Sequence, residues 1–252
     1  MTLIATAISR YGIVQAADSS LTSYPNEIAT GKRIFRLGSV NAVLSITGAY
    51  AVAGEPLNRW VEAAISDYER TAEQPSLSGF VEQLRDRLTS QHEPIHRRAL
   101  HIAGYVADGM HTHPEVYYLR NIRGRAPDGG YGRPGREFVV TEEFWSRDYP
   151  RAETRDTLGE GGARMYLDGF PEKRVAYMVL HKHIHEFYGR VWQSGSKMFR
   201  RPRSLEDIAS LVELDMRIAA AFLITRENGR HRSGGSLEVV MIPAPANAAS
   251  LW

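Results

Sequence analysis

The sequence opens with a threonine directly behind the first methionine, and the pattern of a β-hairpin follows at once. Residues 3–8 and 13–18 are apolar enough to form two strands, and Tyr11-Gly12 between them is typical of a tight turn. Because strands joined by a tight turn pair their ends, Thr2 and Asp18 are expected to lie level with each other. Loss of the methionine would leave Thr2 with both a hydroxyl and a free α-amine, whose pKa is about 7.7–8.0. One residue would then hold a nucleophile and a base.

The composition favours a soluble protein without thiol or metal chemistry. The chain has 252 residues, 43% of them hydrophobic, and a formal net charge of +2, so nucleic acid and acidic membranes are not expected as partners. It has no cysteine, which excludes disulfides and thiolate sites. The sequence contains neither a basic-then-apolar leader nor a long apolar run, so we expect a cytoplasmic protein. His181, His183 and His185 would not converge on one ion from a helix, so no metal or other cofactor is expected.

Hydrophobic periodicity predicts strands, two helices, more strands, two further helices and a last strand. The helices are expected over about 51–71, 77–90, 172–193 and 204–226, the remaining strands over 34–37, 42–46, 99–107, 116–122, 138–140 and 237–242, and a Gly- and Pro-rich loop over 124–135. This order fits an α+β fold, specifically a four-layer αββα sandwich in which two stacked, mainly antiparallel sheets are each covered by a helix pair. Because no internal linker divides the chain, residues 1–252 are predicted to form a single domain, with 243–252 as an extended C-terminal tail.

Five short motifs occur in a fixed order among these elements. They are GIVQAADS at 12–19, GKRI at 31–34, TGA at 47–49, LGEGGA at 158–163 and SGG at 233–235. Together they resemble the N-terminal-nucleophile (Ntn) hydrolases, and specifically the 20S proteasome β subunit and its simpler bacterial homologues. The resemblance extends along most of the chain. It implies the Ntn-hydrolase fold and a threonine-type peptidase activity that cleaves amide bonds.

The resemblance also implies catalytic roles for individual residues. Thr2 would be the nucleophile, and Asp18 would hold a cation beside it, with Ser233 completing the catalytic group. Lys32 and Arg33 both remain candidates for that cation. The two are not equivalent, because a guanidinium stabilises negative charge but does not exchange a proton at neutral pH.

Four further residues are expected around the substrate. Gly48 would present its backbone N–H to the carbonyl oxygen of the substrate as an oxyanion hole, with Thr22 also at the substrate-binding side. Two supporting positions depart from the family pattern: Glu160 stands where serine is usual, and Arg230 where aspartate is usual. The two could form a charge pair that replaces the family residues. They also raise the alternative that the chain has lost catalysis.

Three functions therefore remain open. The first is a threonine peptidase that acts on peptide or protein substrates inside a homo-oligomer, arranged as a ring or a related array. The second is a catalytically silent assembly or scaffold subunit of the same fold, in which Met1 is retained and Thr2 is only the first residue of a strand. The third is a small-molecule amidase. An ATPase or adaptor as a partner stays open, and apolar residues on more than one face of the predicted helix 172–193 favour self-association.

Overall fold

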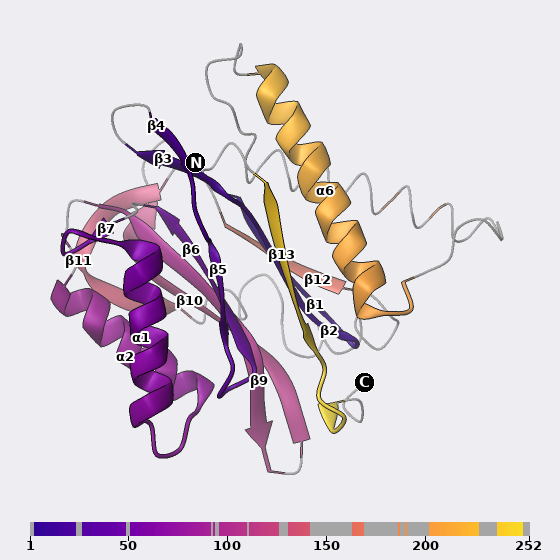
Figure 1. Cartoon of the computed structure of the whole chain (residues 1–252). Coiled ribbons are helices and arrows are strands. Elements are labelled where there is room, and N and C mark those ends of the chain that lie inside the picture. The colour runs from indigo at the N-terminus through magenta and orange to yellow at the C-terminus, as the bar shows by residue number, and fades with distance from the viewer. Residues whose placement is uncertain are drawn as a thin grey trace.

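The computed structural model of the chain describes residues 3–23, 27–48, 51–91, 93, 96–109, 111–125, 131–141, 163–168, 186, 190, 202–226 and 236–248. Within these ranges the fold is α+β, with antiparallel sheets and long helices on their outer sides (Figure 1). The predicted helix 172–193 lies outside the described residues except for Glu186 and Arg190. The predicted tail is described only as far as Ala248.

The first sheet contains the predicted N-terminal hairpin. Its strand order is β12-β1-β2-β13, with β12 at Ala163–Asp168, β1 at Ile4–Ser9, β2 at Gly12–Asp18 and β13 at Leu237–Pro243. β1 and β2 pair from Ile4 opposite Ala17 to Ser9 opposite Gly12, which confirms the hairpin and its register. Gly12 has a φ of +148°, and a Cβ there would lie 2.2 Å from the Ile242 carbonyl oxygen, so this turn requires glycine. Strand β12 was not predicted from the sequence.

The second sheet has five strands in the order β11-β10-β9-β6-β5. Their bounds are β5 Ile34–Leu37, β6 Ala42–Gly48, β9 Arg98–Asp108, β10 His111–Arg125 and β11 Tyr131–Thr141. The prediction of a loop over 124–135 is wrong for most of that range, because β10 continues to Arg125 and Ile122 pairs with Pro134 on β11. Strand β11 lies at the sheet edge, where a proline without an N–H is tolerated.

Two small hairpins stand apart from the main sheets. One pairs β3 (Ser20–Ser23) with β4 (Glu27–Thr30), and the other pairs β7 (Ala51–Val52) with β8 (Glu55–Pro56). The first helix, α1 (Leu57–Thr71), therefore begins six residues later than predicted. The reason is local, since Ala53 and Gly54 both have positive φ, which ends any helix and makes a tight turn.

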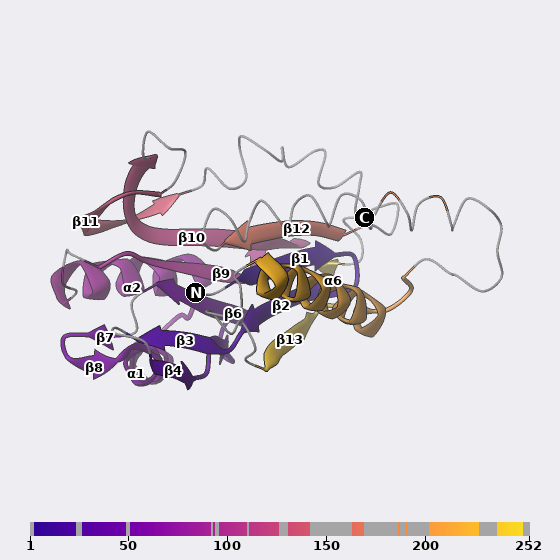
Figure 2. The same cartoon turned by 90° about the horizontal axis from the view of Figure 1, so that it is seen from above.

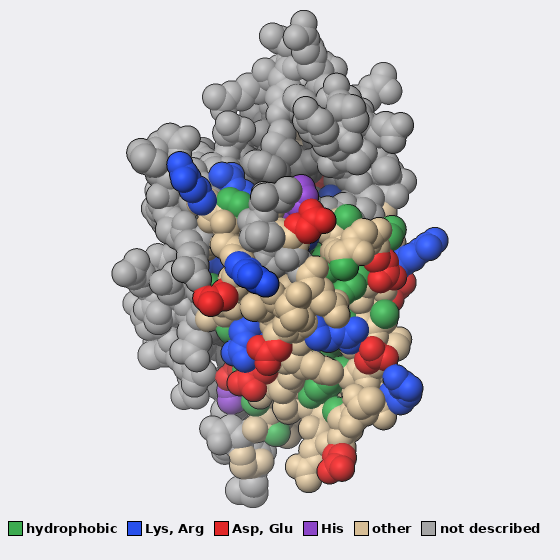
Figure 3. All heavy atoms as spheres, turned by 90° about the vertical axis from the view of Figure 1, so that its left-hand side faces the viewer, with side chains coloured by type: hydrophobic (Ala, Val, Ile, Leu, Met, Phe, Trp, Pro, Cys, Tyr) green, Lys and Arg blue, Asp and Glu red, His purple; other side chains and the backbone are tan. Residues whose placement is uncertain are grey.

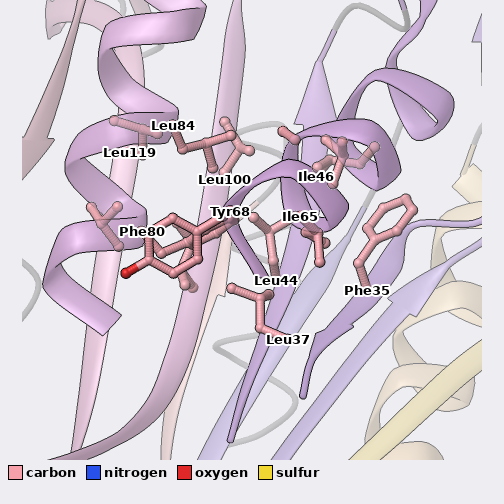
Figure 4. Packing of buried hydrophobic residues seen from close by; sticks show 14 of the residues in the cluster. Phe35, Leu37, Leu44, Ile46, Ile65, Tyr68, Phe80, Leu84, Leu100 and Leu119 are labelled. Carbon is pink, nitrogen blue, oxygen red and sulfur yellow. The ribbon is translucent and has the colours of Figure 1, made fainter. Parts of the chain in front are cut away.

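Helices α1 and α2 (Leu77–Gln91) cover the outer face of the five-stranded sheet (Figures 1 and 4). Residues of α1 at helical spacing, including Trp60, Val61, Ala64 and Ile65, are all buried, as the periodicity predicted. Phe80 of α2 makes an edge-on ring contact with Tyr68 of α1. The strands contribute alternate residues to the same apolar cluster: Phe35, Leu37, Leu44, Ile46, Leu100, Ile102 and Leu119. This cluster joins one helix pair to its sheet.

Two further apolar clusters join the remaining layers. Ile4, Ile8 and Ile13 pack with Val43 and Ala103 between the two sheets. On the opposite face of the first sheet, alternate residues such as Ala5, Ala7 and Val14 pack against α6 (Leu205–Arg226), as the two-residue period of a strand requires. Seen from above, α6 and the α1/α2 pair lie on opposite sides of the sheets (Figure 2).

The start of α6 follows the capping pattern predicted at residues 204–207. The Asp207 N–H donates to the Ser204 hydroxyl at 3.1 Å, and the Asp207 carboxylate accepts the Arg203 N–H at 2.8 Å. The first bond satisfies one of the backbone N–H groups that a helix start leaves without a partner, and the second ties the residue before the cap to the first turn.

On the face that carries α1 and α2, acidic and basic side chains are interspersed (Figure 3). This mixed surface agrees with the small formal net charge of +2. No helix in the described part of the chain is long and apolar enough to cross a membrane.

Candidate functional site

The candidate site lies where β1 begins and β2 ends. The Asp18 N–H donates to the Leu3 carbonyl at 3.2 Å, and the Leu3 N–H donates to Asp18 Oδ1 at 2.9 Å. The hairpin register therefore brings the Asp18 carboxylate to Leu3, the residue next to Thr2. Thr2 itself lies outside the described residues. The expected approach of its hydroxyl to Asp18 stays a prediction.

The two candidate cations, Lys32 and Arg33, have opposite environments. Lys32 is half exposed, and its Nζ lies 2.9 Å from Glu62 Oε1 on α1 and over the ring of Phe35. Arg33 is only 2% exposed. The chain at 31–33 is not part of a strand, so long-range contacts decide which of the two neighbours turns inward. Of this pair, Arg33 is the cation held inside the protein.

Arg33 is fixed against strand β6. Its Nη1 donates to the Ile46 carbonyl at 3.3 Å, and its own carbonyl accepts the Ile46 N–H at 3.1 Å. Ile46 lies two residues before Gly48, the expected oxyanion donor, on the same strand. The guanidinium therefore lies at the end of β6 that carries the predicted oxyanion turn.

An acidic residue that the sequence analysis missed holds the backbone at Arg33. Glu238 on β13 accepts two successive N–H groups with Oε2, from Arg33 at 3.0 Å and from Ile34 at 3.2 Å. Its neighbours Leu237 and Val239 pack with the α6 cluster, whereas Val240 and Ile242 pack between the sheets. A lone acid on the inward side of an otherwise apolar strand was the signal available in the sequence.

Ser19 ties the same region together. Its N–H donates to the Ser236 carbonyl at 3.0 Å, and its hydroxyl lies 3.1 Å from the Ser236 hydroxyl. Its carbonyl accepts the Gly31 N–H at 3.2 Å. Hydrogen bonds thus connect the end of β2, the start of β13 and the segment that leads into Arg33. These bonds explain why a serine suits position 19, independently of any catalytic role.

Gly48 ends β6 with a φ of +97°, a conformation that favours glycine. A Cβ at this position would lie 2.1 Å from the Arg97 carbonyl oxygen. The absence of a side chain is therefore required by the neighbouring backbone. This requirement for glycine holds whether or not the Gly48 N–H faces a substrate.

A second buried guanidinium, also missed in the sequence, connects the end of β6 to strand β7. Arg98 pairs with Gly48 across β6 and β9, is 1% exposed, and donates from Nη2 to the Ala51 carbonyl. Burial lowers the pKa of Arg98 from its usual value, and the charge of Glu93 partly offsets this. Because Arg98 stands directly before the predicted strand 99–107, the sequence gave no signal that it would be buried.

Asn121 on β10 fixes the backbone around Arg98. Its Oδ1 accepts the Arg98 N–H at 2.8 Å, while its Nδ2 donates to the carbonyls of His96 at 2.7 Å and Gly135 at 3.2 Å. Asn121 is fully buried. One amide therefore satisfies three backbone groups from two different segments.

The other expected site residues lie where the structure gives no side-chain geometry. Ser233, Glu160 and Arg230 are outside the described residues, so the proposed Glu160–Arg230 charge pair stays a prediction. The backbone of Thr22 pairs with Ile28 in the β3–β4 hairpin. Its position relative to a substrate also stays a prediction.

Comparisons with known proteins leave the family of this chain open. No protein-family model matches the sequence, and no curated protein is significantly similar to it. Within the ranges that the structure describes, no group of three or more His, Asp or Glu side chains is arranged to hold a metal ion.

Proposed function

We propose that this chain is a proteasome-like Ntn hydrolase that cleaves amide bonds with Thr2 as its nucleophile. The proposal includes the finer fold description, a four-layer αββα sandwich in which residues within 172–193 complete the helix layer beside α6. It also includes a homo-oligomer as the working form, with a peptide or protein as the substrate.

One observation carries the proposal: the Asp18 carboxylate bonds to the backbone of Leu3 at 2.9 Å, next to the proposed nucleophile. Ser19, the residue after Asp18, accepts a hydrogen bond from Gly31, which precedes the buried Arg33 by two residues, and Arg33 in turn bonds to Ile46 near Gly48. An acid, a cation and a backbone turn thus belong to one end of the stacked sheets. These are the groups that an N-terminal nucleophile requires.

The reaction would proceed by acyl transfer. The α-amine of Thr2 takes the hydroxyl proton as the oxygen attacks the substrate carbonyl carbon, and the oxyanion accepts a hydrogen bond from the Gly48 N–H. When the C–N bond breaks, the leaving amine takes that proton from the α-ammonium. Water then attacks the resulting ester, and the threonine hydroxyl is restored. Each proton passes through the amine, so no second base is required.

Arg33 would act in this scheme as a fixed charge. A guanidinium stays protonated throughout the physiological range, so it stabilises the developing alkoxide without carrying a proton. Asp18 would orient the start of β1 through Leu3 and balance the positive charge. Lys32, which pairs with Glu62 at the surface, is left without a catalytic role.

The test combines intact mass with turnover. The purified protein is expected to lack Met1 and to hydrolyse acyl-peptide reporters, and Thr2→Ala is expected to abolish turnover with fold and assembly intact. Thr2→Ser should keep measurable turnover because it keeps a hydroxyl. Thr71→Ala is a matched control, since this threonine ends α1 on the surface and only its backbone-directed hydroxyl bond is lost. Full turnover by Thr2→Ala would disprove the assignment.

A catalytically silent scaffold subunit is the second candidate. The observation that favours it is the surface pairing of Lys32 with Glu62, which leaves the buried Arg33 to supply electrostatic stabilisation alone. A mass that retains Met1, with no turnover and a stable oligomer by light scattering, would support the scaffold. A stable monomer at micromolar concentration would count against both the peptidase array and the scaffold.

A further inference from the structure

The contact between Glu238 and the segment 33–34 is unusual in its form. A single carboxylate oxygen on β13 accepts two successive backbone N–H groups, from Arg33 at 3.0 Å and Ile34 at 3.2 Å. Successive N–H groups that converge in this way form a small binding site for an anion. Here the anion is a side chain of the other sheet, since β13 pairs with β2 and β5 pairs with β6.

Strand β5 explains why the acid is needed. It is an edge strand of only four residues, and β6 is its one neighbour in the five-stranded sheet. N–H groups at the start of an edge strand have no ladder partner on their outer side, and burying such a group without a partner costs free energy. Glu238 satisfies two of them at the point where the chain enters the protein interior.

We propose that Glu238 is a positioning residue for Arg33, an inference that rests on the proposed function. Contacts from both sheets hold Arg33: Glu238 accepts its N–H, its carbonyl accepts the Ile46 N–H, and its guanidinium donates to the Ile46 carbonyl. Two of these anchors lie on β6, and Glu238 is the anchor from the opposite sheet. Glu238 therefore sets how deep the guanidinium lies relative to the β1–β2 end of the site.

The alternative is that Glu238 only joins the two sheets. The chain offers a matched control for this, because Arg36 also links β5 to β13, donating from Nη2 to the Met241 carbonyl at 2.7 Å. Arg36 is exposed and lies in β5, three residues after Arg33. Loss of either residue removes a link between the same two strands, but only Glu238 contacts Arg33.

Three substitutions separate position from charge. Glu238→Gln keeps an acceptor oxygen at the same reach and loses the charge, whereas Glu238→Asp keeps the charge and withdraws it by one methylene. Glu238→Ala removes both. A displacement of about 1 Å in a catalytic group costs on the order of 10²-fold in rate. We therefore expect kcat to fall by about that factor in Glu238→Asp and Glu238→Ala with KM within about 2-fold, and Glu238→Gln and Arg36→Ala to stay within about 3-fold of the wild type.

Amide hydrogen exchange gives a readout that does not depend on turnover. In the wild type and in Glu238→Gln, the amides of Arg33 and Ile34 should be protected, and in Glu238→Asp they should exchange much faster. Arg36→Ala should leave their protection unchanged. If the wild type shows no turnover but this exchange pattern appears, the proposed function fails while Glu238 still positions Arg33.

Specific outcomes would overturn the positioning role. Protected amides at 33 and 34 in both Glu238→Asp and Glu238→Ala would show that the carboxylate does not hold this segment. A loss of kcat in Glu238→Gln with full activity in Glu238→Asp would show that charge and not position matters. A loss of kcat in Arg36→Ala equal to that in Glu238→Ala would show that Glu238 only links the two strands.

Discussion

Gly48 and Arg97 approach so closely that a Cβ built on Gly48 would lie 2.1 Å from the Arg97 carbonyl oxygen. Gly48 also has a φ of +97°, a backbone conformation that residues other than glycine rarely adopt. The two constraints act on the same residue, at the end of β6 where the proposed oxyanion donor stands. Backbone packing against the 97–98 segment therefore requires glycine at position 48 whether or not a substrate binds there.

We predict that Gly48→Ala lowers the free energy of unfolding by about 3 kcal/mol or more, because it combines backbone strain with a clash that a rigid carbonyl cannot relieve. Gly54→Ala is the control. Gly54 has a φ of +80°, but a Cβ added to it would meet no atom of the described residues within 4 Å, so only the backbone strain, about 1 kcal/mol, is expected. Urea unfolding of both variants measures the difference. Equal losses would show that Gly48 is not tightly packed.

Lys32 and Arg33 are predicted to differ sharply in their effects. Lys32→Ala breaks a surface ion pair with Glu62 and should cost less than about 1 kcal/mol, with turnover unchanged. Arg33→Met removes the buried charge and should lower kcat by roughly 10²-fold or more if the proposed function holds. Reporter hydrolysis and thermal unfolding of both proteins check this. Activity lost in Lys32→Ala but kept in Arg33→Met would reverse the assignment.

The local part of the site was predictable from the sequence because it depends on short-range geometry. A tight turn at Tyr11-Gly12 fixes the pairing of β1 with β2, and this pairing alone brings Asp18 to Leu3. The buried stripe of α1 and the cap of α6 follow in the same way from helical periodicity and from Ser204. In each case the partners are close in sequence.

The remaining part was not predictable because it depends on contacts between distant segments. Arg33 is buried and Lys32 is at the surface in the context of long-range contacts, among them the bond from the Arg33 N–H to Glu238, more than two hundred positions later in the chain. The Gly- and Pro-rich composition around Pro134 indicated a loop, but the sheet edge tolerates those residues in β11. Neither fact is encoded in the periodicity of a single segment.

Asn121 is predicted to be among the most sensitive polar residues of the described fold. Asn121→Ala removes the partners of the Arg98 N–H and of the carbonyls of His96 and Gly135, which should lower stability by about 2–4 kcal/mol. Because Arg97 and Arg98 lie against Gly48, reporter turnover should fall as well. Asn247→Ala, which removes a bond from an exposed residue to Thr112, should cost less than about 1 kcal/mol. Similar losses in urea unfolding would contradict the central role of Asn121.

Tyr105 gives a prediction about alkaline stability. Its hydroxyl is buried and has no hydrogen-bond partner among the described residues, and burial raises the pKa of Tyr105 well above its usual value of 10.0. The folded state keeps the proton that the unfolded chain releases near pH 10. Titration of Tyr105 therefore does not affect stability below that pH, and it lowers the free energy of unfolding increasingly as the pH rises from 10 towards the folded-state value.

Tyr105→Phe should therefore be neutral or stabilising by about 1 kcal/mol at pH 7, because it removes a buried hydroxyl without a partner. It should also show a shallower fall in stability above pH 10 than the wild type. Tyr68→Phe is the matched control, since the Tyr68 hydroxyl donates to the Ser76 carbonyl at 2.9 Å and accepts the Ser76 N–H at 3.0 Å. That variant should lose about 1–2 kcal/mol at pH 7. Denaturant unfolding at pH 7 and above pH 10 measures both effects, and a destabilised Tyr105→Phe at pH 7 would mean that the hydroxyl has a partner in solution.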